Sequence, residues 1–402
     1  NLVSSFSGDE SYRYLFEITG LLHDLGKYQK DFQRYLIEGG RRGSVPHASW
    51  GAGYARNLGI LESSFVIDGH HKGLSDHADW KTDTEPFKNN DIGYFDKVVR
   101  EFLADNGIGE SKFKEIKIPS FNKIKSQREL FIRYLFSALT DGDWLSTEEH
   151  FESETHSLRP AFELQIDEMI KKLETAFSLK PVEGEINFLR NEARAEALAN
   201  SVMPCGFFSL SLPTGLGKTL TSMAWALNHA RTNRLKRIIV VLPYVNIIDQ
   251  TAAVFKDIFG ESSVLEHHSG YNEDRSSESS KEYKAPEERM KELACENWDY
   301  PLIVTTTVQF FESLFSNKPS KCRKVHNIAN SVVIFDEVQT LPKHLILPTL
   351  QMLKDVHAVM KTSFLFCTAT QPAFEKRQGF EGIDDIKPLI ASPAKLYEKT
   401  RR

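Results

Sequence analysis

The chain has 402 residues, of which 41% are hydrophobic and 26% charged, and its formal net charge is −5. These values are typical of globular proteins, so they exclude a disordered or fibrous chain, and the length favours two domains over one core. The acidic balance argues mildly against a nucleic-acid-binding protein, although a local basic groove remains compatible with it.

Two further classes of protein are disfavoured by the sequence. No stretch approaches about 18 consecutive apolar residues, the length needed to cross a membrane, and no signal-peptide pattern is present. The cysteines are widely spaced and form no CxxC pair, so we interpret them as free thiols in a reducing compartment; they are Cys205, Cys295, Cys322 and Cys367. We therefore predict a cytoplasmic protein without membrane contact.

The first part of the chain carries helical patterns. From residue 9 to about 180, apolar residues recur at helical spacing, and short β-branched runs are scarce. We predict an all-α domain over residues 1–182, with polar loops near 72–93 and 105–125. The sequence 181–184 (PVEG) follows a helical stretch and reads as a linker.

Histidine and aspartate residues in this first domain form the pattern of a metal site. The candidate ligands are His23, Asp24, His47, His70, His71 and either Asp141 or Asp143, with His77 less favoured. Imidazole and carboxylate groups suit Mn, Fe, Co, Ni or Zn, and the carboxylate of Asp24 could bridge two ions. Two ions about 3.5–4 Å apart can activate water and stabilise the leaving oxygen of a phosphodiester.

The remainder, residues 183–402, shows a different pattern. Short runs rich in β-branched and aromatic residues alternate with helix-length segments; the runs are 206–212, 237–242, 302–305, 331–335 and 363–367. Such alternation predicts a parallel sheet with helices on both faces. We expect residues 271–290 to be a loop followed by a short exposed helix.

A glycine-rich loop joins the first of these strands to a helix predicted over residues 220–230. Its backbone N–H groups could surround phosphate oxygens, Lys218 could reach the β- and γ-phosphates, and Thr219 could ligate Mg²⁺. Asp336 would hold the magnesium, and Glu337 would polarise the attacking water. The residues expected to contact ATP and Mg are Pro213, Thr214, Gly215, Gly217, Lys218, Thr219 and Asp336.

The order of residues 213–219, 336–339 and 368–370 resembles motifs I, II and III of superfamily 2 helicases. Residues 242–244 with Gln250, and 305–307 with Gln309, resemble the DNA-contacting motifs Ia and Ib. The resemblance covers about residues 185–380 and implies the first of two RecA-like lobes. Since no second lobe pattern follows, we expect this chain alone to bind ATP weakly and not to unwind a duplex.

The first domain resembles the HD nuclease of the CRISPR-associated nuclease–helicases of type I systems. The matching segments are 23–27, 32–36, 47–52, 69–71 and 137–147, and 266–269 also match within the helicase part. The resemblance implies metal ligation by the histidines and Asp24, catalytic roles for Asp24, Lys27 and Glu337, and Asp143 as the last ligand because it precedes Trp144 and Leu145. His267 and His268 read as structural or as a contact between lobes. The family has a further ligand histidine upstream, so we expect the natural N-terminus to be missing.

Together these resemblances imply a multidomain α and α/β protein, with an all-α HD-type metal domain followed by a RecA-like parallel-sheet lobe. They imply a metal-dependent single-stranded DNA nuclease with an ATP-dependent 3′–5′ translocase, acting in the prokaryotic cytoplasm. Its cofactors would be two divalent transition metal ions (Mn, Fe, Co or Ni) and ATP with Mg. Its partners would be the displaced strand of an R-loop, a crRNA-guided surveillance complex and inhibitor proteins. Alternatives are an HD phosphohydrolase acting on nucleotides and an inactive truncated binding module.

Overall fold

The computed structural model describes residues 2–41, 43–89, 92–109, 111–114, 116, 124–159, 163–268, 285–368 and 374–400. Two compact units are present. The first unit combines Asn1–Ser157 with Ser313–His326, and the second combines Leu158–Glu312 with Asn327–Arg402. The predicted fold class, an all-α part followed by a parallel-sheet α/β part, is confirmed.

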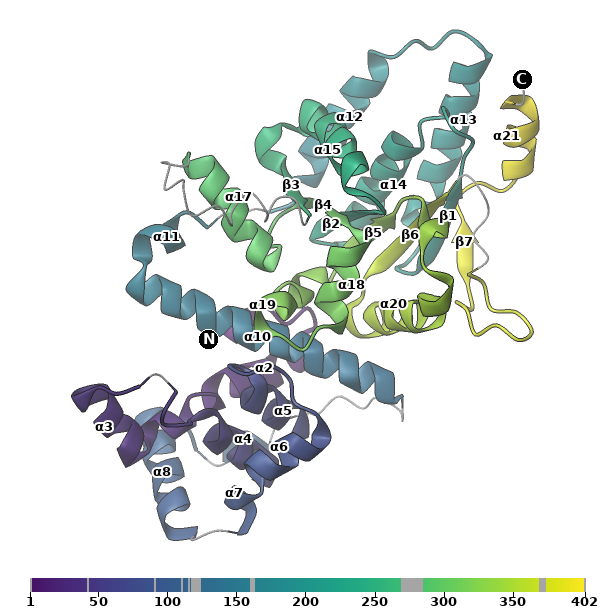
Figure 1. Cartoon of the computed structure of the whole chain (residues 1–402). Helices are drawn as coiled ribbons and strands as arrows, with labels where there is room; N and C mark the ends of the chain where they lie inside the picture. Colours follow the sequence, from purple (N-terminus) through teal and green to yellow (C-terminus); the bar gives the residue numbers. More distant parts are fainter. Residues whose placement is uncertain are drawn as a thin grey trace. The chain divides into compact units, whose positions relative to one another are not determined.

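The first unit is built from helices (Figure 1). They are α1 (Leu2–Ser5), α2 (Glu10–Leu22), η1 (Leu25–Tyr28), α3 (Lys30–Glu38), α4 (Ala48–Asn57), α5 (Leu61–Gly69), α6 (His77–Thr84), α7 (Pro86–Asn89), α8 (Ile92–Asp105), α9 (Ser111–Lys114), α10 (Lys125–Phe151), α11 (Ser153–Ser157) and α19 (Pro319–Cys322). The long helix α10 packs against α2 and α5, and its middle third is buried. This helix therefore forms the centre of the unit.

The prediction of a loop near 72–93 was wrong in part, because helices α6 and α7 lie in this segment. The segment is polar because α6 exposes most of its surface and is anchored by the buried Trp80 and Thr84. Asp76 caps its N-terminus by accepting hydrogen bonds from the backbone of Ala78 and Asp79. The loop predicted near 105–125 contains, among its described residues, the short helix α9.

The second unit alternates strands and helices. Its helices are α12 (Ile166–Ser178), α13 (Glu185–Ala199), η2 (Asn200–Val202), α14 (Lys218–Asn233), α15 (Val245–Phe259), η3 (Glu261–Ser263), α17 (Pro286–Asn297), α18 (Thr307–Phe315), η4 (Val325–Ile328), η5 (Val338–Thr340), η6 (Lys343–Leu345), α20 (Ile346–Met360) and α21 (Pro393–Thr400), of which α18 and η4 cross the boundary between the units. Its strands are β1 (Phe207–Ser211), β2 (Arg237–Leu242), β3 (Val264–His267), β4 (Leu302–Thr306), β5 (Ser331–Phe335), β6 (Ser363–Thr368) and β7 (Ile386–Pro388).

These strands form one parallel sheet in the order β3-β4-β2-β5-β6-β1-β7. Alternate residues point to opposite faces, and each face is covered by helices (Figure 1). One face packs in an apolar core with α12, α13, α14 and α15. On the other, Phe335 stacks on Phe311 of α18, and Phe207 contacts His357 of α20, with ring centroids 5.8 and 5.1 Å apart.

All five predicted strands are present, but β3 and β7 were not predicted. Both are edge strands of only four and three residues, too short to show a period. Pro388 closes β7, a position that an edge strand tolerates. Of residues 271–290, the loop lies outside the described residues, and the helix that follows it is α17.

Residues 158–182 lie in the second unit, where α12 packs against α14 and α15. The sequence-based boundary at residue 182 stays a prediction. In the part of the chain that the structure describes, no helix combines the length and apolar character needed to cross a bilayer.

Candidate functional site

The candidate metal ligands of the first unit lie at the ends of different helices. His23 caps the C-terminus of α2, His47 precedes α4, His70 caps the C-terminus of α5, and Asp143 lies on α10. The helix ends converge because two glycines permit close backbone contact. A Cβ atom on Gly26 would lie 2.2 Å from the His47 carbonyl oxygen, and one on Gly51 would lie 2.1 Å from that of Leu22.

These side chains form one cluster. Nitrogen atoms of His47, His70 and His71 lie within 4.8 Å of one another, and Nε2 of His47 is 3.0 Å from Nε2 of His71. Nε2 of His23 lies 3.4 Å from Oδ2 of Asp24 and 3.5 Å from Oδ1 of Asp143. Nε2 of His47 lies 3.8 Å from Oδ1 of Asp24. Asp24 therefore lies between two of the histidines.

Two of these histidines have a fixed ring orientation and a buried Nε2 atom. Nδ1 of His23 lies 2.8 Å from the carbonyl oxygen of Gly20, and Nδ1 of His70 lies 2.6 Å from that of Ile67. A carbonyl accepts only, so Nδ1 must carry the proton and Nε2 of a neutral ring then bears a lone pair. Both Nε2 atoms are buried; that of His70 has no hydrogen-bond partner among the described residues, and that of His23 faces the carboxylates of Asp24 and Asp143. Such an arrangement fits metal ligands whose second ring nitrogen is held by the protein.

The protonation behaviour of His47 and His70 also fits ligands, whereas the pKa of His23 reflects its pairing with Asp143. Burial lowers the pKa of His47 to about 4 and that of His70 well below its ordinary value, so both rings are neutral at pH 7. Burial alone would lower the pKa of His23, but the hydrogen bond and charge of Asp143 raise it overall. Burial would raise the pKa of Asp143, and the interactions with His23 outweigh it and lower that pKa to about 2.

Asp141 and Asp143, the two competing acids, have different surroundings. Asp143 faces His23, whereas Asp141 is fully buried and paired with Arg323, 2.8 Å from Nε to Oδ1. Asp143 is therefore the acid that joins the histidine cluster.

Lys27 and His77 were the other candidates in this domain. Nζ of Lys27 lies 2.7 Å from Oδ2 of Asp24. The His77 ring packs beside Phe65 and Trp80, with centroids 6.2 and 5.4 Å away, and is not in the histidine group. Lys27 therefore borders the cluster and His77 does not.

The phosphate loop of the second unit lies at the carboxyl edge of the sheet, between β1 and α14, where open α/β sheets bind ligands. Gly215 and Gly217 have φ of 89° and 78°, a region that favours glycine. Nζ of Lys218, the first residue of α14, lies 2.9 Å from Oδ1 of Asp336 and also pairs with Glu337. Burial lowers the pKa of Lys218, but these carboxylates raise it overall.

A hydrogen-bonded chain extends from this acidic pair to β6. Glu337 accepts a hydrogen bond from the side-chain nitrogen of Gln339, and Thr368 donates one to Oε1 of Gln339 over 2.8 Å. The segments compared with motifs II and III are thus in contact at Thr368. Residues 369 and 370 of the segment compared with motif III lie outside the described residues.

The segments compared with motifs Ia and Ib also meet. Oγ1 of Thr307 lies 3.3 Å from the carbonyl oxygen of Leu242. Tyr244 and Val308 are exposed beside them, whereas Gln309 is buried.

His267, which the sequence suggested to be structural or a contact between lobes, has a structural partner. Its Nδ1 accepts a hydrogen bond from Trp298 over 2.7 Å.

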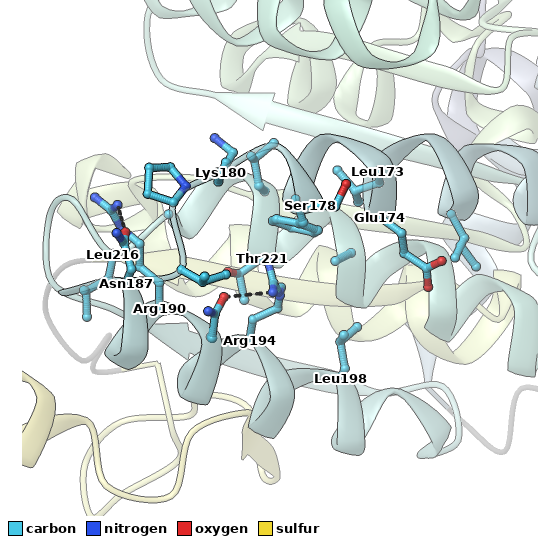
Figure 2. A pocket seen from close by; sticks show the side chains of 18 of the residues that line it. Leu173, Glu174, Ser178, Lys180, Asn187, Arg190, Arg194, Leu198, Leu216 and Thr221 are labelled. Atoms are coloured by element: carbon cyan, nitrogen blue, oxygen red, sulfur yellow. Dashed lines mark hydrogen bonds between the residues drawn. The ribbon is translucent and has the colours of Figure 1, made fainter. Parts of the chain in front are cut away.

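Arg190 of α13 is a site residue that the sequence did not reveal. Its Nε and Nη2 donate to the carbonyl oxygen of Gly215 over 2.8 and 2.6 Å. A cavity of about 480 Å³ adjoins this contact, between the loop, α12, α13 and α14. Figure 2 shows Arg190 and Arg194 among its lining residues, and the Arg194 guanidinium lies 3.8 Å from the Phe177 ring centroid. No local motif marks these arginines, because α13 is an ordinary polar helix by sequence.

Comparison with known proteins shows which proteins this chain is similar to. Residues 192–377 match the DEAD/DEAH box helicase family. The CRISPR-associated nuclease/helicase Cas3 of Haloferax volcanii is 25% identical over 443 residues, which cover 91% of this chain and 46% of that protein. The putative CRISPR-associated nuclease/helicase Cas3 of Methanocaldococcus jannaschii is 25% identical over 424 residues, which cover 93% of this chain and 57% of that protein. The chain spans about half the length of these relatives.

Solved structures agree with the fold. T. fusca Cas3 bound to AMPPNP superposes with a TM-score of 0.58 at 16% identity, covering 91% of this chain and 45% of that one. A chain of a CRISPR RNA-guided surveillance complex before nicking superposes with a TM-score of 0.53 at 16% identity, covering 90% and 41%.

Residues 192–377, which lie largely in the second unit, are therefore similar to DEAD/DEAH box helicases. Over nearly its whole length the chain is Cas3-like, and the predicted resemblance to CRISPR-associated nuclease–helicases is confirmed.

Proposed function

We propose that this chain joins a metal-dependent nuclease for single-stranded DNA to an ATP-dependent 3′–5′ DNA translocase, and that it degrades invader DNA in type I CRISPR interference. The observation that carries the nuclease half is the buried Nε2 atom of His70, which has no hydrogen-bond partner among the described residues, in a cluster where the Nε2 atom of His23 faces two carboxylates. A buried polar atom without a partner is costly, and metal ions at this cluster would satisfy Nε2 of His70 and neutralise the carboxylates beside His23.

The proposed ligand sets follow the distances in the cluster. His47, His70 and His71 with Asp24 would hold one ion, and His23, Asp24 and Asp143 would provide part of the site for a second. Bound Mn, Fe, Co or Ni ions would supply an activated water and neutralise the leaving oxygen.

The protein's own groups would orient and neutralise the substrate. The carbonyls of Gly20 and Ile67 keep the Nε2 lone pairs of His23 and His70 directed into the cluster. Lys27 holds Asp24 in place and offers a cationic group to the scissile phosphate.

The motor half would bind ATP with Mg at the phosphate loop. Lys218 would exchange its carboxylate partners for the β- and γ-phosphates, which leaves Asp336 to hold magnesium and Glu337 to polarise water. Thr219 lies directly after Lys218, and the neighbouring cavity of about 480 Å³ has room for the remainder of a nucleotide.

The proposed DNA substrate is the displaced strand of an R-loop. A chain within a CRISPR RNA-guided surveillance complex shares this fold, which supports recruitment of the present chain by such a complex. Inhibitor proteins would be further partners that act on the same complex.

The test is cleavage of circular single-stranded DNA, which offers no free end. We expect cleavage with Mn²⁺ and without ATP, no cleavage with EDTA, and none with Asp24→Ala. His77→Ala is the matched control, because this histidine lies in the same unit outside the cluster and should leave cleavage intact.

Other results would favour the alternatives. Metal-dependent hydrolysis of nucleotides without DNA cleavage would indicate a phosphohydrolase. A folded chain that binds Mn²⁺ but hydrolyses neither substrate would indicate a binding module. Full DNA cleavage by Asp24→Ala protein would overturn the assignment of the site.

A further inference from the structure

Residues 313–326 follow the helicase-like motif Ib in sequence but belong to the first unit. This segment, which contains α19, packs against α10. It contacts the unit at two places that flank the histidine cluster, one in the loop after His71 and one on α10 beside Asp143.

The first contact is made by backbone at the loop after His71. The N–H of Leu74 donates to the carbonyl oxygen of Asn317 over 2.9 Å, and the Asn317 amide donates back to the carbonyl of Leu74 over 3.3 Å. The contact is close, because a Cβ atom on Gly73 would lie 2.7 Å from the Asn317 carbonyl oxygen, and Gly73 has a φ of +100°. The segment thereby fixes the end of the loop that begins at His70 and His71.

The second contact is a buried ion pair. Nε and Nη2 of Arg323 lie 2.8 and 2.7 Å from Oδ1 of Asp141, whose side chain is wholly buried. Nε2 of His326 lies 3.5 Å from Oδ2 of the same carboxylate. The Arg323 guanidinium also lies over the Trp144 ring, 4.6 Å from its centroid.

The same face of α10 is held one turn earlier. Oγ of Ser137 accepts the backbone N–H of His326 over 2.9 Å and lies 3.0 Å from its Nδ1. Ser137 and Asp141 are four residues apart, so both face the segment. Asp143 lies two residues beyond Asp141, about 200° round the helix, and faces His23 instead. A rotation of α10 that broke the Asp141 contact would therefore also displace Asp143.

We propose that Arg323 is a positioning residue of the metal centre, which through Asp141 sets the rotation of α10 and thus the place of Asp143. The segment 313–326 is then part of the nuclease, although it lies within the helicase half of the sequence. This inference rests on the proposed nuclease function. Groups that orient metal ligands typically change metal affinity by roughly 10–100-fold when they are removed.

The experiment compares Arg323→Gln with Arg56→Gln in the full chain. Arg56 is a matched control, because it lies in the same unit, pairs with Glu85 over 2.8 Å and lies 4.9 Å from the Trp80 ring centroid, yet contacts neither α10 nor the cluster. Mn²⁺ affinity is measured by the electron paramagnetic resonance signal of the free ion. Urea unfolding is followed in parallel, and DNA cleavage is titrated with Mn²⁺.

We expect Arg323→Gln to weaken Mn²⁺ binding by roughly 10–100-fold and to raise the Mn²⁺ concentration for half-maximal cleavage by the same factor. Arg323→Lys should recover part of the Mn²⁺ affinity. Arg56→Gln should lower the stability of the fold and leave the Mn²⁺ affinity unchanged. If Arg323→Gln does not fold, the double variant Asp141→Leu/Arg323→Met removes both charges together and should show the same loss of Mn²⁺ affinity.

Unchanged Mn²⁺ affinity in a folded Arg323→Gln or double variant would overturn the inference and leave the proposed nuclease standing. A wild-type chain that takes up no Mn²⁺ would overturn the nuclease proposal itself, and this inference with it.

Discussion

Nζ of Lys218 lies 2.9 Å from Oδ1 of Asp336, so the phosphate loop and the acidic pair after β5 form one site in the tertiary structure. Because the lysine has carboxylate partners here, phosphate must compete with them for it. The metal cluster lies in the other unit and shares no residue with this site.

The first prediction concerns Lys218→Ala. Nucleotide affinity should fall tenfold or more, since a hydrogen bond to a charged group contributes about 1.5–3 kcal/mol. Binding can be measured with a fluorescent ATP analogue. Single-stranded DNA cleavage should persist, because it needs only the metal cluster. Lys376→Ala is the control, a lysine with carboxylate partners elsewhere in the same unit. Loss of cleavage in folded Lys218→Ala protein would contradict the independence of the two sites.

The second prediction concerns Arg190→Ala, which removes two hydrogen bonds to the Gly215 carbonyl. The loop should then be less well ordered, and nucleotide affinity should fall roughly 2–10-fold, as expected for one or two exposed hydrogen bonds. Arg231→Ala on α14 provides the comparison, since the described contacts of Arg231, an ion pair with Asp167 and a hydrogen bond to Asn228, do not include the loop. Equal affinities of the two variants would show that Arg190 does not support the loop.

The third prediction concerns Gly26→Ala. The added Cβ would lie 2.2 Å from the His47 carbonyl oxygen, so the start of α4 must move and His47 with it. Such overpacking costs about 1–3 kcal/mol of stability and should also weaken Mn²⁺ binding. Urea unfolding and Mn²⁺ titration would measure both effects. Gly109→Ala has space for its methyl group and should change neither quantity. A Gly26→Ala chain with wild-type Mn²⁺ affinity would contradict the prediction.

The fourth prediction concerns pH and His229, which is buried between Ser201 and Ser363. Burial lowers the pKa of His229 to about 4. The unfolded chain, with an ordinary histidine pKa of 6.5, binds a proton that the folded chain does not. The stability contribution is therefore complete above pH 6.5 and is lost as the pH falls towards 4.

This loss amounts to at most about 3 kcal/mol. Urea midpoints measured between pH 7.5 and 4.5 should fall less steeply for His229→Gln than for the wild type. The difference between the two chains isolates His229 from the other histidines. Parallel curves would refute the assignment of this histidine as a neutral buried group.

Local patterns predicted much of this protein. The strands of the central sheet are short β-branched runs, and their continuous apolar character follows from burial on both faces, so they could be placed within a residue or two. The phosphate loop could be recognised because strand, glycine turn, Lys218 and helix are contiguous in sequence. Edge strands β3 and β7 were missed because each is too short for a period to emerge, and α6 was missed because most of its residues are polar and exposed.

Residue patterns defined the kinds of group available: six positions for metal ligands, a phosphate loop and its acidic partner. Residue type and spacing left Asp141 and Asp143 both open, and only the family resemblance favoured Asp143. Only the tertiary structure turned Asp143 towards His23 and Asp141 towards Arg323. The physical reason is that a helix presents successive residues to different neighbours. The neighbour of Asp141 belongs to segment 313–326, far along the chain. A contact between residues so far apart in sequence produces no periodic pattern that could predict it.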